Sequence, residues 1–176
     1  MKIITWNCNG AFRKKYQVLD HFDPDILVIQ ECEDPARSNS EYEGWAGEYL
    51  WTGKNKNKGL GIFAKRDNQL VALDWNDHEL ELFLPCRIND SFNLIGIWTK
   101  NPESQKFRYI GQLWMYLQLK KENISSDRMV LCGDLNSNAI WDKKHKGCSH
   151  SDVVRELESL DTVSYTHLTL PTICSV

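Results

Sequence analysis

The sequence predicts an α/β domain, and three observations support this prediction. Continuous apolar runs of strand length occur at residues 26–29 and 129–132, which is typical of strands that are buried on both faces. Apolar residues recur at helical spacing in residues 12–22 and 103–122, which predicts amphipathic helices. The middle third of the chain holds short strand candidates separated by polar breaks, and this pattern indicates an antiparallel meander. Because no internal repeat or low-complexity linker interrupts the 176 residues, they are predicted to form one domain.

The N-terminal part is predicted to run from strand to helix to strand. Residues 3–6 are rich in β-branched and aromatic side chains, as strands are, and they lead into a turn-like loop at residues 7–10. The helix predicted at residues 12–22 ends before Pro24, because the residue before a proline disfavours helical geometry. The buried strand at residues 26–29 then leads into a second polar loop.

Strands dominate the middle third, and two helices flank one more strand in the last third. The strand candidates of the middle third are residues 49–51, 60–64, 70–73, 80–86 and 92–98. The long helix predicted at residues 103–122 has Pro102 at its start, where proline is tolerated. A last helix is predicted at residues 151–160, with Ser151 or Asp152 as its N-cap.

Charge and cysteine content narrow the class of protein. Lysine and arginine number 21 against 24 acidic residues, so the net charge is −3, and no basic block occurs. This balance disfavours passive binding to nucleic acid, but a bound divalent cation can supply positive charge in an enzyme. The six cysteines include no C-x-x-C pair, which favours a reduced, cytoplasmic chain. We expect no membrane span and no export signal, and nothing in the sequence indicates an obligate protein partner.

The segment at residues 163–176 differs abruptly in composition from the rest of the chain. It contains no Asp, Glu, Lys or Arg, although these residues make up 26% of the whole sequence. Codons for residues 162–172 can be chosen that reproduce the transposon end and adapter of a common sequencing-library method. We therefore expect residues 1–162 to be the domain and residues 163–176 to be a non-native tail. The alternative is a native final strand that includes Val163 and Tyr165.

Three predicted strands end in loops that carry carboxylate or amide side chains. Asn7 and Asn9 follow the first strand, Glu31 follows the second, and Asp134 and Asn136 follow the strand at residues 129–132. Strand ends on one edge of an α/β sandwich converge, and a hard cation such as Mg²⁺ binds carboxylate and amide oxygens. Each residue also has a simpler interpretation, as a helix cap, a turn residue or a solvated acid. Their combination favours a metal site.

The segments around these side chains resemble a known superfamily. The motifs are ITWNCNG at residues 4–10, PDILVIQE at residues 24–31 and GDLNS at residues 133–137. In order and content they are similar to the leading motifs of the endonuclease/exonuclease/phosphatase superfamily, to which deoxyribonuclease I and exonuclease III belong. The resemblance covers roughly residues 1–160. It implies an α/β fold with a two-sheet sandwich flanked by helices, here incomplete at the C-terminus.

The resemblance also implies roles for individual residues. Glu31 and Asn7 would hold a divalent metal, Mg²⁺ or Mn²⁺, and Asn9 would lie beside it. Asp134 would orient or deprotonate the attacking water, and Asn136 would donate a hydrogen bond to the phosphate. The implied activity is metal-dependent hydrolysis of a phosphoester, possible substrates being DNA, RNA and small phosphoesters. A non-catalytic binding module on the same fold is the alternative, and the chain as written is expected to be an inactive fragment.

The sequence departs from the family pattern at two places. Family members commonly have histidine or tyrosine where this chain has Trp98, so either Lys100 replaces that phosphate contact or the contact is absent. We count Trp98, Lys100 and Asn138 with Asn9 as candidate substrate-binding residues. The closing aspartate-histidine pair of the family is expected beyond residue 160 and is missing.

Two further residues keep two interpretations each. His150 is either a catalytic base or an ordinary residue at the start of a helix, and the second interpretation is favoured. Trp141 either borders the substrate, with Lys143, Lys144 and His145 as a basic cluster, or belongs to a solvated charged loop.

Overall fold

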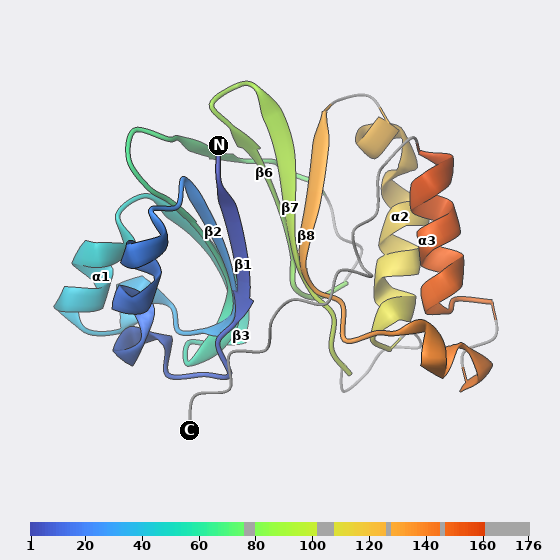
Figure 1. Ribbon diagram of the computed structural model, residues 1–176, viewed down its shortest axis with the longest axis horizontal. Coiled ribbons are helices and arrows are strands. Elements are labelled where there is room, and N and C mark those ends of the chain that lie inside the picture. The colour runs from blue at the N-terminus through green and yellow to red at the C-terminus, as the bar shows by residue number, and fades with distance from the viewer. Residues whose placement is uncertain (76–79, 102–107, 126–127, 145–146, 161–176) are drawn as a thin grey trace.

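The protein folds as a sandwich of two facing β-sheets with helices on both outer sides (Figure 1). The computed structural model describes residues 1–75, 80–101, 108–125, 128–144 and 147–160. Both sheets contain parallel and antiparallel neighbours. The predicted α/β fold with a two-sheet sandwich flanked by helices is therefore confirmed. The segment predicted to be a non-native tail lies outside the described residues.

The first sheet is built from the N-terminal part of the chain. Its strands, in spatial order, are β1 (Ile3–Asn7), β2 (Ile26–Cys32), β4 (Lys58–Ala64) and β3 (Tyr49–Asn55). β1 and β2 run parallel, whereas β4 is antiparallel to both of its neighbours. The 3₁₀ and α-helical segments of this part are η1 (Phe12–Lys14), η2 (Tyr16–Phe22), η3 (Pro35–Arg37) and α1 (Ser40–Ala46). Residues of η1, η2 and α1 pack on the outer face of this sheet.

The second sheet is built from the chain that follows. Its strands, in spatial order, are β5 (Leu70–Ala72), β6 (Phe83–Ile88), β7 (Phe92–Trp98) and β8 (Met129–Asp134). The first three form an antiparallel meander, and β8 is parallel to β7. Helices α2 (Ile110–Ser125) and α3 (His150–Ser159) cover the outer face, and η4 (Ala139–Lys144) connects β8 to α3. The predicted meander thus occurs here, while the hairpin β3–β4 joins the other sheet.

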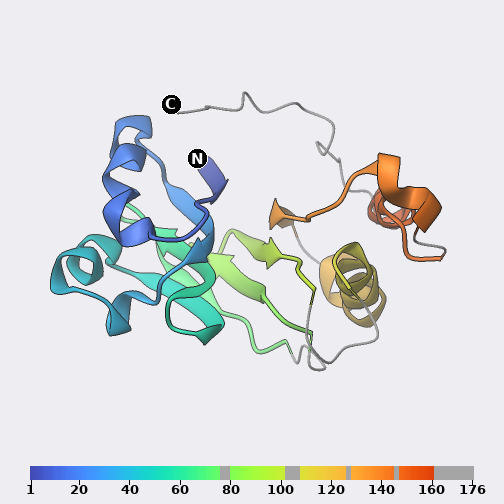
Figure 2. The same cartoon turned by 90° about the horizontal axis from the view of Figure 1, so that it is seen from below.

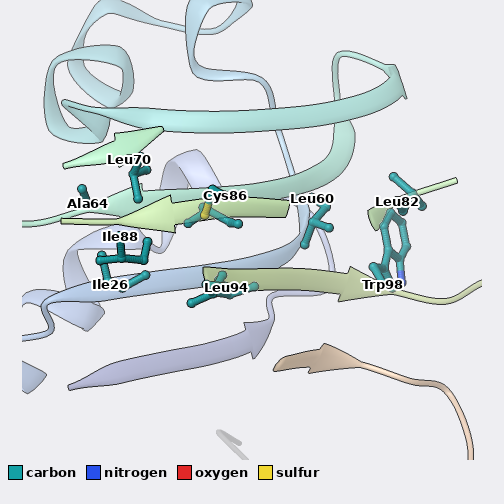
Figure 3. Close-up of a cluster of buried hydrophobic side chains, with 11 residues drawn as sticks. Ile26, Leu60, Ala64, Leu70, Leu82, Cys86, Ile88, Leu94 and Trp98 are labelled. Carbon is teal, nitrogen blue, oxygen red and sulfur yellow. The ribbon is translucent and has the colours of Figure 1, made fainter. Parts of the chain in front are cut away.

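Successive side chains of β2 point to opposite faces of the sheet, and both faces are buried, which explains the continuous apolar run at residues 26–29. Ile26 and Val28 point into the core between the sheets, whereas Leu27 and Ile29 point toward the helices outside. Trp98 lies at the end of β7 beside Leu82 in the same inter-sheet core (Figure 3). Three layers of apolar packing therefore hold the sandwich together, one between the sheets and one under each helical layer.

An aromatic cluster anchors the chain after β1. Phe12 is fully buried. Its ring lies 5.6 to 6.0 Å from the rings of four neighbours, which are Trp6, Tyr42, Trp45 and Phe63. Aromatic pairs at such separations stabilise a core beyond the area they bury. The loop between β1 and η1 is consequently held against the first sheet.

Two predicted helices differ from those observed. The helix predicted at residues 12–22 is split into η1 and η2, because Lys15 leaves helical geometry and its ammonium group donates to the carbonyls of Cys8 and Gly10. The long helix begins at Ile110, not at residue 103, since Tyr109 has a φ of 51° that a right-handed helix does not tolerate. Residues 102–107, on which the rest of that prediction falls, lie outside the described residues.

Other boundaries were missed or shifted. The strand predicted at residues 80–86 is observed as Phe83–Ile88, and α1 was not predicted at all. α1 is short, and its N-cap Asn39 accepts a hydrogen bond from the backbone of Tyr42. No helix in the described part of the chain is long and apolar enough to cross a membrane.

The N-cap of α3 is Ser149, not Ser151 or Asp152. The Ser149 hydroxyl accepts from the backbone N–H of Asp152, and the Asp152 carboxylate accepts from the backbone N–H of Ser149. This reciprocal capping box satisfies two backbone donors that the helix leaves unpaired.

Ser149→Ala is expected to lower the free energy of unfolding by about 1 kcal/mol, because the cap is lost. Urea denaturation measures this change. Ser159→Ala at the far end of α3 is the matched control and should change stability by less than about 0.5 kcal/mol. Equal losses in the two variants would contradict a capping role for Ser149.

Candidate active site

The carboxyl ends of β1, β2 and β8 meet at one edge of the sandwich. Because β1 and β2 are parallel and Asn7 is opposite Gln30, the loops that follow them start side by side. β8 contacts both strands across the sandwich. In Figure 1 the ends of β1 and β8 both point to the bottom of the view, and Figure 2 shows this edge from below.

Asn7 links the two sheets at this edge. Its Nδ2 donates to Oδ2 of Asp134 at 2.7 Å and lies 3.4 Å from Oε1 of Glu31. Its Oδ1 accepts from the backbone N–H of Asn9 at 3.0 Å. Two carboxylates from different sheets therefore converge on one amide side chain.

A β-bulge aims Glu31 at this point. The pairing of β2 with β4 shifts register between Gln30 and Cys32, and Glu31 has a φ of 67°. A non-glycine residue in this region is strained, and bulges commonly redirect a side chain next to an active site. The Glu31 side chain is 15% exposed, so it faces the site with limited access to solvent.

The loop after β8 presents Asn136 beside Asp134. The backbone N–H of Asn136 donates to Oδ1 of Asp134 at 2.9 Å, and its Nδ2 donates to the carbonyl of Thr99 at 2.7 Å. Asn136 has a φ of 43° and Asn9 a φ of 52°, and asparagine is one of the few residues that accept this region. Three predicted site residues, counting Glu31, thus have left-handed backbones, which indicates a constrained site.

Buried contacts hold the loops after β1 and β2 together. Arg13 forms an ion pair with Glu33, which is 3% exposed, and its backbone N–H donates to the same carboxylate at 3.2 Å. Cys8 lies between Asn7 and Asn9, and burial raises the pKa of its thiol to about 11. The raised pKa favours the neutral thiol over the nucleophilic thiolate.

Sequence reasoning missed Lys58. Its ammonium group lies 2.8 Å from Oε2 of Glu31 and 5.7 Å from the centre of the Trp98 ring. Lys58 belongs to a lysine-rich polar break that looked like an ordinary turn. Only the pairing of Gly59 with Cys32 shows that this residue lies at the end of β2.

Among the predicted substrate-binding residues, Trp98 and Lys100 lie next to each other, whereas Asn138 lies in the loop before η4. Trp98 is 5% exposed and packs in the inter-sheet core, so its ring offers little surface to a substrate. The Lys100 ammonium lies 5.5 Å from that ring and 3.5 Å from Oε2 of Glu81. Asn138 is exposed, and its side chain accepts from the backbone N–H of Ile140 at the start of η4. Their roles in binding remain predictions.

The donor set at the edge fits a hard divalent cation. The described residues contain no group of three His, Cys, Asp or Glu side chains that could hold a metal. The predicted metal ligands Glu31 and Asn7 offer one carboxylate and one amide, and the Asn7 amide nitrogen lies within hydrogen-bond distance of both Glu31 and Asp134. Asn7 presents its nitrogen to the carboxylates, and metal binding therefore requires this amide to turn its oxygen toward them.

Comparisons with solved structures find the same fold in nucleases. A 3′–5′ exonuclease from Neisseria meningitidis matches with a TM-score of 0.61 and 23% identity, over 91% of this chain and 71% of that chain. An AP endonuclease from Archaeoglobus fulgidus matches with a TM-score of 0.58 and 22% identity, over 91% and 70%. The endonuclease domain of TRAS1, a telomere-specific non-LTR retrotransposon, matches with a TM-score of 0.57 and 12% identity, over 90% and 71%. At these identities the likeness concerns the fold.

Sequence comparison identifies the family. Among curated protein sequences none matches significantly. The model of the Endonuclease/Exonuclease/phosphatase family matches residues 4–171. This range includes residues 163–171 of the segment at residues 163–176, whose non-native origin stays a prediction. Since the match covers nearly the whole chain and the fold agrees, the chain belongs to the endonuclease/exonuclease/phosphatase family.

Proposed function

We propose that the full-length parent of this chain hydrolyses phosphoester bonds with the help of a divalent cation, Mg²⁺ or Mn²⁺, while the inactivity of the chain as given stays a prediction. The observation that carries this proposal is the contact from Asn7 to Asp134 and Glu31, which gathers two carboxylates and an amide from two sheets. Glu31 and Asn7 hold the metal in this proposal. When bound, such a metal offsets the charge of the phosphate and polarises it. Family membership supports the reaction class.

Asp134 acts as the general base in this proposal. It orients a water molecule, whose oxygen attacks phosphorus while the leaving oxygen departs on the opposite side, and it accepts the proton of that water. The hydrogen bond from the backbone N–H of Asn136 fixes its carboxylate in place. It leaves the remaining lone pairs of the carboxylate for the water.

Asn136 stabilises the phosphate. Its amide nitrogen carries two hydrogens, and one of them is donated to the Thr99 carbonyl. The second hydrogen can be donated to a phosphate oxygen as negative charge develops there. Because the Thr99 contact fixes the side chain beforehand, little ordering is needed during the reaction.

The substrate is proposed to be a nucleotide or a nucleic acid. The exonuclease and the AP endonuclease with the same fold support this class. The net charge of −3 and the lack of a basic block favour a substrate that the protein contacts only near the cleaved bond. They disfavour a nucleic acid bound along an extended basic surface.

Removal of divalent cations is expected to abolish hydrolysis. The assay follows release of product from a chromogenic phosphodiester, a mononucleotide and a short DNA strand, with excess EDTA or with Mg²⁺. Glu31→Gln, which removes a ligand charge, should raise the Mg²⁺ concentration for half-maximal rate about 10- to 100-fold. Asp90→Asn is the matched control, because Asp90 is exposed in the turn between β6 and β7, away from the site edge.

The outcomes separate enzyme from binding module. Hydrolysis that EDTA stops and Mg²⁺ restores, with the stated shift in Glu31→Gln alone, supports the proposal. The assay uses the full-length parent, for which hydrolysis insensitive to EDTA, or none on any substrate, would overturn the proposal and favour the binding module on the same fold.

A further inference from the structure

A pocket of about 330 Å³ adjoins the candidate active site. It lies between the loop after β8, the start of α2, η4 and the first residue of α3. Asn136 forms part of its wall and also donates to Asp134, so one residue belongs to both the pocket and the proposed catalytic edge. Small-molecule sites have volumes of about 300–1,000 Å³, and this pocket is at the lower end of that range.

Two exposed aromatic rings line the pocket. Trp141 is 45% exposed and Tyr109 is 39% exposed. The other tryptophans in the described part of the chain are buried or partly buried. Tyr109 has a φ of 51°, and its backbone N–H donates to the carbonyl of Lys100 at 3.0 Å. Strained backbone that holds an exposed aromatic ring at a pocket indicates a binding role.

The rest of the wall is polar but not basic. His150 is 5% exposed, and its Nδ1 lies 3.2 Å from the Ser137 hydroxyl. The Asp142 carboxylate accepts from the hydroxyl and the backbone N–H of Ser151 and from the backbone N–H of His150. These bonds lower the pKa of Asp142, so it is ionised at neutral pH.

The described lining of the pocket disfavours a phosphate and suits a neutral ring. Of the eight described residues that line it, none is lysine or arginine, whereas Asp142 contributes a negative charge. Aromatic side chains stack on any nucleobase. Hydroxyl and amide groups such as those of Ser137 and Asn138 form hydrogen bonds with the edges of a base.

We propose that this pocket binds the nucleobase of the nucleotide whose phosphate lies at Asn136, with Trp141 and Tyr109 as the stacking surface. This inference rests on the proposed function, since it names the substrate as a nucleotide with an unpaired base next to the cleaved bond. A base held in this way positions the phosphate at Asn136. It also makes base stacking a source of substrate affinity.

Equilibrium binding tests the pocket apart from catalysis. Isothermal titration calorimetry with Mg²⁺ present compares adenosine 5′-monophosphate and adenosine 3′-monophosphate with ribose 5-phosphate, which lacks the base. At least one adenosine nucleotide is expected to bind about tenfold more tightly than ribose 5-phosphate. Trp141→Ala should weaken the binding of that nucleotide about tenfold and leave ribose 5-phosphate unchanged. Trp141→Phe should retain most of the affinity.

Ile140→Ala is the matched control. Ile140 is the neighbouring residue of η4, is 76% exposed and does not belong to the pocket lining. It should bind both nucleotides like the unaltered protein. Thermal unfolding of each variant checks folding.

Failure of this inference and failure of the proposed function are distinguishable. The inference is overturned if Trp141→Ala binds both nucleotides as well as the unaltered protein does, or if it loses ribose 5-phosphate equally. Base-dependent binding through Trp141 without hydrolysis of any substrate would support the pocket and overturn only the hydrolase.

Discussion

Replacing Asp134 with asparagine is expected to lower kcat for phosphoester hydrolysis about 1,000-fold, within the range that removal of a general base produces. The variant keeps the shape of the side chain but cannot take a proton from water. KM should change little, because the proposed substrate contacts come from Asn136 and the pocket beside it. Steady-state kinetics at saturating Mg²⁺ measures both parameters.

The Asp134→Asn variant also has a predictable cost in stability. Oδ1 and Oδ2 of Asp134 each accept a hydrogen bond, and an amide offers only one oxygen. One donor is therefore left without its partner, at a cost of about 1–3 kcal/mol if it stays desolvated. A folded variant that keeps more than about a tenth of the original kcat would rule out Asp134 as the base.

Gly133→Ala is expected to prevent stable folding, with a loss of at least about 3 kcal/mol. Gly133 has a φ of 148°, and a Cβ atom built there would lie 1.8 Å from the carbonyl oxygen of Ile97. That oxygen belongs to the backbone of β7, which pairs with β8 at this residue, so it cannot move aside cheaply. Only a residue without a side chain lets the two strands approach here.

Gly47→Ala provides the comparison for Gly133→Ala. Gly47 has a φ of 60°, but a Cβ atom there would meet nothing within 4 Å. It should therefore cost only the backbone preference, about 1–2 kcal/mol. Thermal and urea denaturation of both variants measure the difference. Similar losses at the two positions would show that backbone conformation, not the close approach of β7, decides the effect at Gly133.

The elements that sequence patterns predicted best are those whose pattern reflects their own burial. The run at residues 26–29 is apolar throughout because β2 packs on both faces, so it could be recognised directly. By contrast, η1 and η2 carry a helical pattern of apolar residues, yet the chain deviates at Lys15 because its side chain binds carbonyls of the preceding loop. Such a contact depends on tertiary structure, and no local pattern contains it.

The residues of the candidate site also divide into those that the sequence predicted and those that only the tertiary structure reveals. Asn7, Glu31 and Asp134 could be selected because strand ends converge in this class of fold, and the structure brings them into contact. The ion pair of Lys58 with Glu31 depends on the register of β4 against a bulged β2, which the sequence does not encode in any short motif. For Trp98, the histidine or tyrosine of the family pattern suggested a substrate contact; its ring is buried in the core, and its role in binding stays a prediction.

The division of the chain between the sheets has a consequence for how the protein responds to stress. In the part of the chain that the structure describes, all strands of the first sheet lie within residues 3–64, and all strands of the second lie within residues 70–134. The proposed metal ligands Asn7 and Glu31 come from one half, and Asp134 and Asn136 come from the other. A small separation of the two sheets would break the Asn7–Asp134 hydrogen bond, while the hydrogen bonds within each sheet would remain. Turnover is thus expected to respond to a separation of the two halves before circular dichroism does, because circular dichroism records the helices and strands within each half.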